Sequence, residues 1–330
     1  MELIYDIYGH AVRVRSDDTI IADAARDVLG QFPPLKTAEG PVLEIAMSAV
    51  DCPGTIPFKR TESTVLVGRI PKRGVDIEGN LLRDGRRWII EFGAALIVLD
   101  PANGRAEGWI VRPNRDAPDS SAIFILMAVI ELLRTREVYA VHCSALAQGG
   151  QGILFIGPGG SGKTTACISL TRAGYHCLSD DHPLLRVRDG KLEILPFPGR
   201  LFVAPRTVAW FPELDAAQEN FRPGPRKRSF MLSDIAGYRG GGACRPSLLI
   251  FPRITDVDES VFEPMSRARA LEELLPQTVL VMDPAMAARQ FETISRLVKE
   301  TPAYRLHFGQ DVERLPALVA QLTESVTARN

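Results

Sequence analysis

The sequence has few cysteines, and none of them are paired at metal-binding spacing. The five are an odd number and no two form Cys-x-x-Cys: Cys52, Cys143, Cys167, Cys177 and Cys244. This pattern argues against a disulfide framework and against a structural zinc site. It favours a reducing cytoplasm as the location of the protein.

Long hydrophobic runs and an excess of one charge are also missing. The most apolar run, AIFILMAVI (122–130), is about half the length needed to span a bilayer. The N-terminus lacks a basic start followed by an apolar core, so no signal peptide is predicted. The formal net charge is −1, which gives no general attraction to nucleic acid or to an acidic membrane. We therefore expect neither as a partner.

The length of 330 residues predicts about two domains. Residues 1–115 read as a β-rich α+β domain with one helix, Asp17–Leu29, and repeated short strands between 41 and 111. The spacing of the turns favours antiparallel pairing. This part contains no group of residues that is typical of catalysis or of metal binding, so we expect it to bind substrate or to act as a scaffold. Residues 112–121 are a predicted linker to a second domain, 120–330.

The second domain alternates helices and strands. A helix is predicted over 122–135, followed by strands over 138–148 and 152–156 that a GGQG hairpin turn joins. A strand over 303–308 and a helix over 311–326 end the pattern. This order is typical of an α/β fold.

A glycine-rich loop follows the strand 152–156. GPGGSGKT (157–164) fits G-x-x-x-x-G-K-[ST], the phosphate loop, between an apolar strand and a helical pattern. Its backbone N–H groups would face nucleotide phosphates, Lys163 would add a positive charge, and Thr164 would bind Mg²⁺. The predicted nucleotide contacts are Gly157, Gly159, Gly160, Ser161, Gly162, Lys163, Thr164 and Thr165.

Two adjacent aspartates close the same stretch. The helix after the loop stops at Gly174, and a short strand over 175–178 leads to Asp180 and Asp181. A right-handed crossover would lay this strand beside the loop strand, with both carboxylates near the γ-phosphate. One would hold Mg²⁺ and the other would accept the proton of an attacking hydroxyl. The alternative is a solvated turn.

Three histidines lie nearby. His142 is predicted on the strand before the hairpin, which brings it close to the loop or to the aspartates. The alternative for it is a hydrogen-bonded core residue. His176 and His182 are weaker candidates, because one lies away from the sheet end and the other follows the aspartates.

A basic loop, FRPGPRKRSF (221–230), is a further candidate for the nucleotide site. Lys227 and Arg228 would grip the triphosphate or the charge of a transferred phosphoryl group. The alternative is a solvated basic loop. Nucleic-acid binding is a poorer use, because no aromatic residues are interleaved with the charges.

The combination of His142, GPGGSGKTT and AGYHCLSDD resembles the HPr serine kinase family, and the likeness covers about residues 138 to 310. It implies a catalytic domain with a fold related to phosphoenolpyruvate carboxykinase and an activity that phosphorylates a serine hydroxyl with ATP and Mg²⁺. Carried over by position, it implies phosphate and metal roles for Lys163 and Thr164. Asp180 and Asp181 would be the metal-linked acid and the general base, and His142 would support them.

The segment LEILPFPGRLFVAP (192–205) departs from that family, because it lacks the Glu-Ile/Val-Arg-Gly-Leu-Gly motif. The resemblance therefore does not extend to HPr as the acceptor or to the reverse reaction. The chain looks more like the related kinases of modified peptides, including those of lasso-peptide precursors. A homo-oligomer is also what the resemblance suggests.

The predicted function is an ATP- and Mg²⁺-dependent kinase that phosphorylates a serine-type hydroxyl of a peptide or protein. Two alternatives stay open. One is a small-molecule kinase, which also places an aspartate soon after the phosphate-loop helix. The other is a nucleotide-sensing regulatory protein that transfers nothing.

Overall fold

The computed structural model describes residues 1–70, 79–92, 95–112, 120–212, 214, 222–223, 228–278 and 283–328. The chain divides into two compact units, Met1–Val138 (unit 1) and Tyr139–Asn330 (unit 2). The sequence analysis put the division between 115 and 120, so the helix expected to open the second domain belongs to unit 1. Residues 113–119 of the predicted linker lie outside the described residues.

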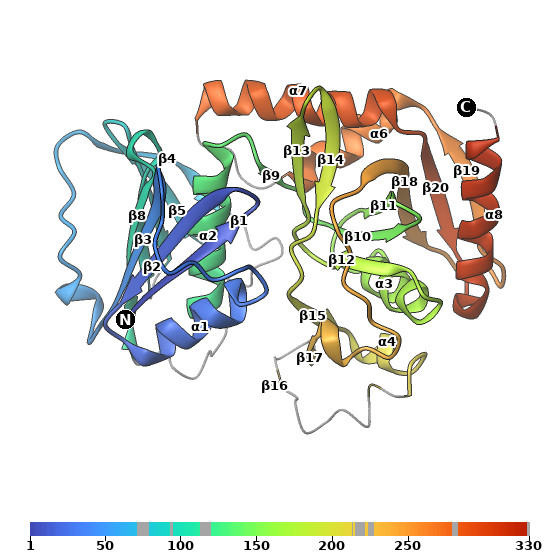
Figure 1. Ribbon diagram of the computed structural model, residues 1–330, viewed down its shortest axis with the longest axis horizontal. Coiled ribbons are helices and arrows are strands. Elements are labelled where there is room, and N and C mark those ends of the chain that lie inside the picture. The colour runs from blue at the N-terminus through green and yellow to red at the C-terminus, as the bar shows by residue number, and fades with distance from the viewer. Residues whose placement is uncertain are drawn as a thin grey trace. The chain divides into compact units, whose positions relative to one another are not determined.

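Unit 1 is built on one mixed eight-stranded sheet (Figure 1), in the order β1-β2-β3-β8-β7-β6-β5-β4. Alternate residues are buried, as in Val12 and Val14 or Leu43, Ile45 and Met47, because successive side chains of a strand point to opposite faces. The strands are β1 (Glu2–Ile7), β2 (His10–Ser16), β3 (Val42–Val50), β4 (Thr64–Ile70), β5 (Gly79–Asp84), β6 (Arg87–Phe92), β7 (Ala95–Asp100) and β8 (Arg105–Val111).

The expectation of purely antiparallel pairing in this region is wrong. β2 pairs with β3, and β3 with β8, in parallel. Parallel neighbours need a long connection, and helix α1 (Thr19–Leu29) supplies the one between β2 and β3. The helix predicted over Asp17–Leu29 is present but begins at Thr19, because the side chain of Asp18 caps it by accepting hydrogen bonds from the backbone N–H groups of Ile20 and Ile21.

A second helix in unit 1, α2 (Ser120–Arg134), accounts for the longest apolar run of the sequence. It packs against α1 and against β3, β7 and β8, and the rings of Phe92 and Phe124 lie 5.4 Å apart. Its apolar residues are therefore covered within unit 1. In the described ranges, no helix is long and apolar enough to cross a membrane.

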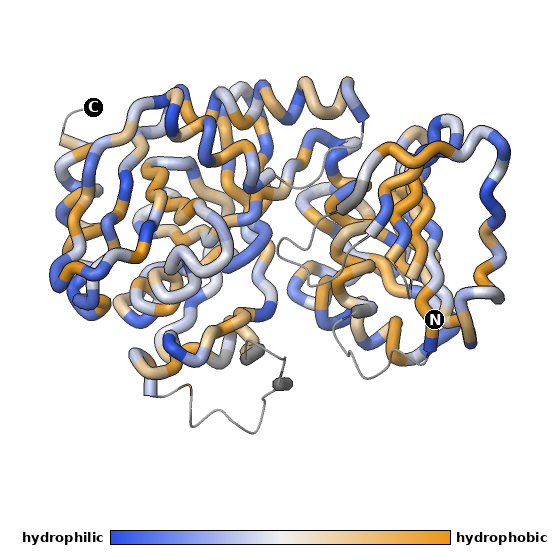
Figure 2. The backbone as a smooth tube through the Cα atoms, turned by 180° about the vertical axis from the view of Figure 1, so that it is seen from behind, coloured by the Kyte–Doolittle hydropathy of each residue, from blue (hydrophilic) through white to orange (hydrophobic). Residues whose placement is uncertain are grey.

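Unit 2 is built on a six-stranded sheet in the order β12-β10-β11-β18-β20-β19, in which β11, β18 and β20 are parallel. In Figure 2 the orange, hydrophobic stretches of the chain include much of its strands. The strands of this sheet are β10 (Cys143–Gln148), β11 (Gln151–Ile156), β12 (His176–Ser179), β18 (Arg245–Ile254), β19 (Val261–Met265) and β20 (Ala303–Phe308).

Helices cover both faces of this sheet. Ile153 and Phe155 of β11 pack in one core cluster with residues of α3 (Lys163–Arg172) and α8 (Leu315–Thr327). Their neighbours Leu154 and Ile156 pack in a second cluster with residues of α6 (Arg267–Leu274) and α7 (Pro284–Glu300). The continuous apolar run of β11 thus reflects a strand that is buried on both faces.

Two smaller sheets and several short helices complete the described fold. The sheets have the orders β14-β13-β9 and β15-β17-β16. Their strands are β9 (Tyr139–Ala140), β13 (Leu184–Arg188), β14 (Lys191–Leu195), β15 (Arg200–Val203), β16 (Arg222–Pro223) and β17 (Arg228–Met231). The short helices are α4 (Pro205–Val208), η1 (Pro53–Thr55), η2 (Pro101–Asn103), η5 (Leu232–Asp234), η6 (Leu275–Gln277) and η7 (Val312–Arg314).

Two sequence expectations about the centre of unit 2 need correction. The strand predicted over 138–148 is two strands, because β9 pairs with β13 in a different sheet from β10. In addition, β12 pairs with β10 and not with β11. Since β10 is antiparallel to both, β11 and β12 still run in the same direction. The residues after β12 therefore reach the same edge of the sheet as the glycine-rich loop.

Candidate functional site

The glycine-rich loop, residues 157–162, joins the end of β11 to the start of α3. Gly160 and Gly162 have φ angles of 83° and 107°, in the region that favours glycine. A Cβ atom at Gly162 would lie 2.8 Å from the ring of Phe308. This loop therefore needs glycine for its backbone shape and for its packing against β20.

The side chain of Lys163 turns back onto the loop. Its Nζ donates hydrogen bonds to the carbonyl oxygens of Gly157 (2.7 Å) and Pro158 (3.1 Å), and the residue is only 7% exposed. The same Nζ lies 3.4 Å from Nε2 of His142. A buried ammonium group is thus fixed at the start of the loop, where a helix N-terminus also favours an anion.

The hydroxyl groups of Ser161, in the loop, and Thr165, in α3, have different surroundings. The Oγ of Ser161 is buried and has no hydrogen-bond partner among the described residues. Burying a hydroxyl without a partner is costly, so this atom fits a site that a ligand completes. The hydroxyl of Thr165 instead lies 3.1 Å from that of Thr207 in α4.

Asp180 is held by hydroxyl groups from two other elements. Ser144 Oγ of β10 donates to its Oδ1 (2.6 Å), and Thr164 Oγ1 of α3 donates to its Oδ2 (2.8 Å). The residue is 8% exposed. Burial raises the pKa of Asp180 to about 6, although the two hydroxyl hydrogen bonds pull it down. Both donors are neutral, so no cation within the described part of the chain contacts this buried carboxylate to match its charge.

Asp181 faces two imidazoles. Nδ1 of His142 donates to its Oδ1 (2.6 Å), and Nδ1 of His182 lies 3.3 Å from its Oδ2. Its side chain is 38% exposed. Desolvation raises the pKa of Asp181, but the charge of His182, the hydrogen bond and charge of His142 and the charge of Lys163 outweigh it and hold the pKa below its usual range. Asp181 is therefore an ionised carboxylate with access to solvent.

The geometry separates the roles of the two aspartates. Asp180 points to α3 and β10, whereas Asp181 points to the histidine pair. His142 lies in a bend between β9 and β10, not within a strand as predicted, and its backbone N–H donates to Gln277 O (2.8 Å). In that bend its imidazole links Lys163 on one nitrogen to Asp181 on the other.

Three residues that the sequence analysis did not select join this group. Ser144 binds Asp180, and Arg206 of α4 donates from Nη2 to the carbonyl oxygen of Gly160 (2.9 Å). His182, ranked as a weak candidate, contacts Asp181, and burial lowers its pKa. Its position next to the aspartates was the available signal. Ser144 and Arg206 gave none, because folding brings them in from distant parts of the sequence.

The remaining candidates are His176, Lys227 and Arg228. His176 begins β12 and its Nδ1 lies 2.8 Å from Gly240 O, away from the aspartates. Lys227 lies outside the described residues. Arg228 begins β17, and its side chain is not among those the structure describes.

The site contains two groups of residues that could bind a metal ion. Thr164 and Asp180 present oxygen atoms, the donors that Mg²⁺ prefers. The ligand atoms of His142, Asp181 and His182 lie within 4.8 Å of one another. Since Asp181 already accepts a hydrogen bond from His142 and lies 3.3 Å from Nδ1 of His182, this second group reads as a carboxylate held by two imidazoles.

No family model matches the chain. No curated protein matches it either. Among solved structures, the chain is similar to the HPr(Ser) kinase/phosphatase from Coxiella burnetii, with 12% sequence identity and a TM-score of 0.34. The likeness covers 58% of this chain and 91% of that chain. Identity and TM-score are both low, so neither a reaction nor a ligand of this chain follows from the likeness.

Proposed function

We propose that the chain is a kinase that transfers the γ-phosphoryl group of ATP to a serine-type hydroxyl of a peptide or protein. One observation carries the proposal. An ionised, solvent-accessible carboxylate, Asp181, is joined through His142 to the lysine of a glycine-rich loop. An acceptor hydroxyl and a nucleotide phosphate could therefore meet at one point.

The nucleotide is bound by the glycine-rich loop. The backbone N–H groups of 157–162, the free hydroxyl of Ser161 and the ammonium of Lys163 all favour phosphate oxygens. Arg206 adds a guanidinium beside Gly160. Because that group contacts only a carbonyl oxygen among the described residues, it is available to a transferred phosphoryl group.

Thr164 and Asp180 are the residues that would hold Mg²⁺. Their oxygens lie together, and a cation there would offset the cost of burying the Asp180 carboxylate. When bound, Mg²⁺ neutralises charge on the phosphate oxygens. Ser144 fixes the orientation of Asp180 and leaves the side facing Thr164 for the ion.

Asp181 accepts the proton of the acceptor hydroxyl. The hydroxyl oxygen forms a bond to the γ-phosphorus, the bond to the β,γ-bridging oxygen breaks, and ADP leaves. His142 and His182 orient the carboxylate. Since the charge of His182 and the hydrogen bond of His142 keep Asp181 ionised, it can orient the hydroxyl from the start and take its proton late, as the loose transition state of phosphoryl transfer requires.

The proposal is tested with Asp181→Asn and Asp180→Asn. We expect Asp181→Asn to bind ATP normally and to slow phosphoryl transfer by about 10²- to 10⁴-fold. Asp180→Asn should weaken the dependence of ATP binding on Mg²⁺. Transfer is measured by mass spectrometry with a peptide pool and with a metabolite pool, and ATP binding by calorimetry.

The matched control is Asp189→Asn, an exposed aspartate with φ 49°, a conformation that asparagine also tolerates. It should leave transfer unchanged. Full transfer by both site variants would refute the mechanism. Product in the metabolite pool alone would favour a small-molecule kinase, and ATP binding without any product would favour a nucleotide sensor.

A further inference from the structure

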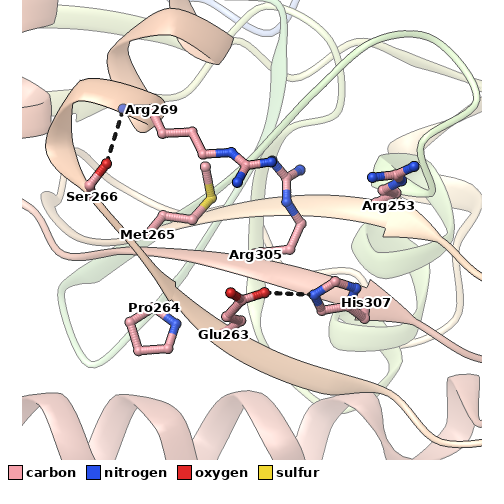
Figure 3. A pocket seen from close by; sticks show the side chains of 8 residues that line it. All are labelled: Arg253, Glu263, Pro264, Met265, Ser266, Arg269, Arg305 and His307. Carbon is pink, nitrogen blue, oxygen red and sulfur yellow. Dashed lines mark hydrogen bonds and ion pairs between the residues drawn. The ribbon is translucent and has the colours of Figure 1, made fainter.

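A cavity of about 180 Å³ lies in unit 2, and Figure 3 shows the side chains that line it. Its walls come from the ends of β18 and β20, from β19 and from the first turn of α6. The charged residues around it are Arg253, Glu263, Arg269, Arg305 and His307. None of them belongs to the site described above.

Two of the arginines share one carboxylate. Arg305 is 9% exposed, donates to Phe251 O (3.2 Å) and pairs with Glu273. Arg269 Nε lies 3.4 Å from the same Glu273 oxygen. Figure 3 shows the two guanidinium groups side by side. One carboxylate therefore faces two fixed positive charges.

The third arginine, Arg253, adds to the excess of positive charge around the cavity. His307 Nε2 pairs with Glu263 Oε2 (3.0 Å), but Arg253 is exposed and has no hydrogen-bond or ion-pair partner among the described residues. Three guanidinium groups thus meet two carboxylates. A guanidinium binds a carboxylate through two parallel hydrogen bonds, so the cavity fits a small anionic group.

Strand alternation fixes where this cavity lies relative to the loop. A Cβ at Gly162 would contact Phe308 and Ile254, so these two side chains are on the loop side of the sheet. Arg253 and His307 precede them and pair with each other across β18 and β20. They therefore point to the other face, toward α6.

The dimensions of two elements set the scale of the distance between the cavity and the backbone of His142. From β20 to β10 there are three strand spacings, or about 14 Å. Along the other route, α6 has eight residues and is about 12 Å long. It leads into η6, whose Gln277 accepts the N–H of His142. Either length equals about four residues of an extended peptide.

We propose that this cavity binds a carboxylate side chain of the acceptor, and that the acceptor is an acidic peptide with that side chain about four residues from the phosphorylated hydroxyl. The proposal rests on the proposed function and names its substrate class. The cavity is the docking subsite, and the Asp181 carboxylate is the reacting subsite.

The experiment uses the full chain and serine peptides in which one glutamate is moved stepwise away from the serine, each with a matched glutamine peptide. Binding is measured by fluorescence anisotropy and phosphorylation by mass spectrometry. We expect the glutamate peptide with the matching spacing to bind about tenfold more tightly than its glutamine partner. Arg253→Gln and Arg269→Gln should each remove that preference.

Arg267→Gln is the matched control, because Arg267 is an exposed arginine of the same helix that does not line the cavity. It should keep the preference for glutamate. Arg253→Glu keeps the assay informative if a neutral variant misfolds, since it should transfer the preference to a lysine-containing peptide.

Equal binding of the glutamate and glutamine peptides to the native protein would overturn the proposal. So would inorganic phosphate that binds in an Arg253-dependent way without any preference among the peptides, because the cavity would then serve a free anion. If the peptide preference depends on Arg253 but no peptide is phosphorylated, the docking subsite stands and the kinase activity fails.

Discussion

Among the described residues, each unit buries one carboxylate whose pKa is raised. In unit 1, Glu131 of α2 is 5% exposed and burial raises its pKa to about 7. In unit 2, burial raises the pKa of Asp180 to about 6. Glu131 pairs at 2.6 Å with Arg134, one turn further along the same helix. Asp180 is bound by hydroxyls that come from β10 and α3.

The difference separates a structural pair from a candidate site. Glu131 is matched by a fixed cation three residues away, so the pair is complete within one helix. Asp180 is matched by neutral donors that folding brings together, so its charge is left for a ligand cation. Buried charge by itself thus does not mark function, and the origin of its partners is the better guide.

The largest expected loss of stability comes from breaking the ion pair between Glu131 and Arg134. Arg134→Met would leave Glu131 buried without its cation, and we expect the free energy of unfolding of unit 1 to fall by about 3 kcal/mol above pH 7, where the Glu131 carboxylate is ionised. Denaturant titration followed by the fluorescence of Trp88 and Trp109, both in unit 1, measures it.

Removing both charges provides the control. Glu131→Leu combined with Arg134→Met should recover most of the loss, because neither charge remains buried. The ATP binding that we propose for unit 2 should be the same in both variants as in the native protein. A double variant as unstable as the single one would show that the pair is not the cause.

The second effect concerns pH. The folded-state pKa of Glu131 is raised from 4.5 to about 7, so its contribution to stability is fully present below the unfolded pKa and is lost as pH rises through the folded one. We expect the stability of unit 1 to fall by about 3 kcal/mol across that window. Unfolding of the native protein and of Glu131→Gln, measured along a pH series, tests this expectation. The variant should lose the pH dependence, and an unchanged slope would contradict the assignment.

The smallest expected change in stability comes from removing a hydroxyl group that binds Asp180. Ser144→Ala removes one of the two hydroxyls that bind Asp180, and we expect unit 2 to lose about 1–2 kcal/mol of stability. The pKa of Asp180 should rise further, since that hydrogen bond favours the ionised form. Ser325→Ala, at an exposed serine of α8, is the comparison and should have almost no effect. Equal stability of the two variants would show that Ser144 does not support Asp180.

Local features of the fold were predictable from the sequence. The turn at Gly149 and Gly150 and the end of α3 before Gly174 both depend on neighbouring residues, and the structure has them. The glycine-rich turn between β11 and α3 was predictable for the same reason. What it binds stays a prediction.

Long-range pairing was not predictable in the same way. The parallel strands of unit 1 and the insertion of β10 between β11 and β12 depend on which buried faces meet. A strand pattern gives the residues that face the core and does not give the neighbouring strand. Ser144 and Arg206 were missed at the site, and His182 was ranked low, because their roles depend on those neighbours.

The glycine-rich turn and the apolar strand that leads to it follow from the sequence alone, because each is set by backbone geometry within a few residues. The adjacent aspartates are likewise visible in the sequence. Only the tertiary structure decided that Asp180 turns to Thr164 and Ser144 while Asp181 turns to His142 and His182. This follows because the start of β10 and the end of β12 meet at one edge of the six-stranded sheet, beside the bend that joins β9 to β10. Their side chains are then brought within hydrogen-bonding distance by pairings that no local pattern encodes.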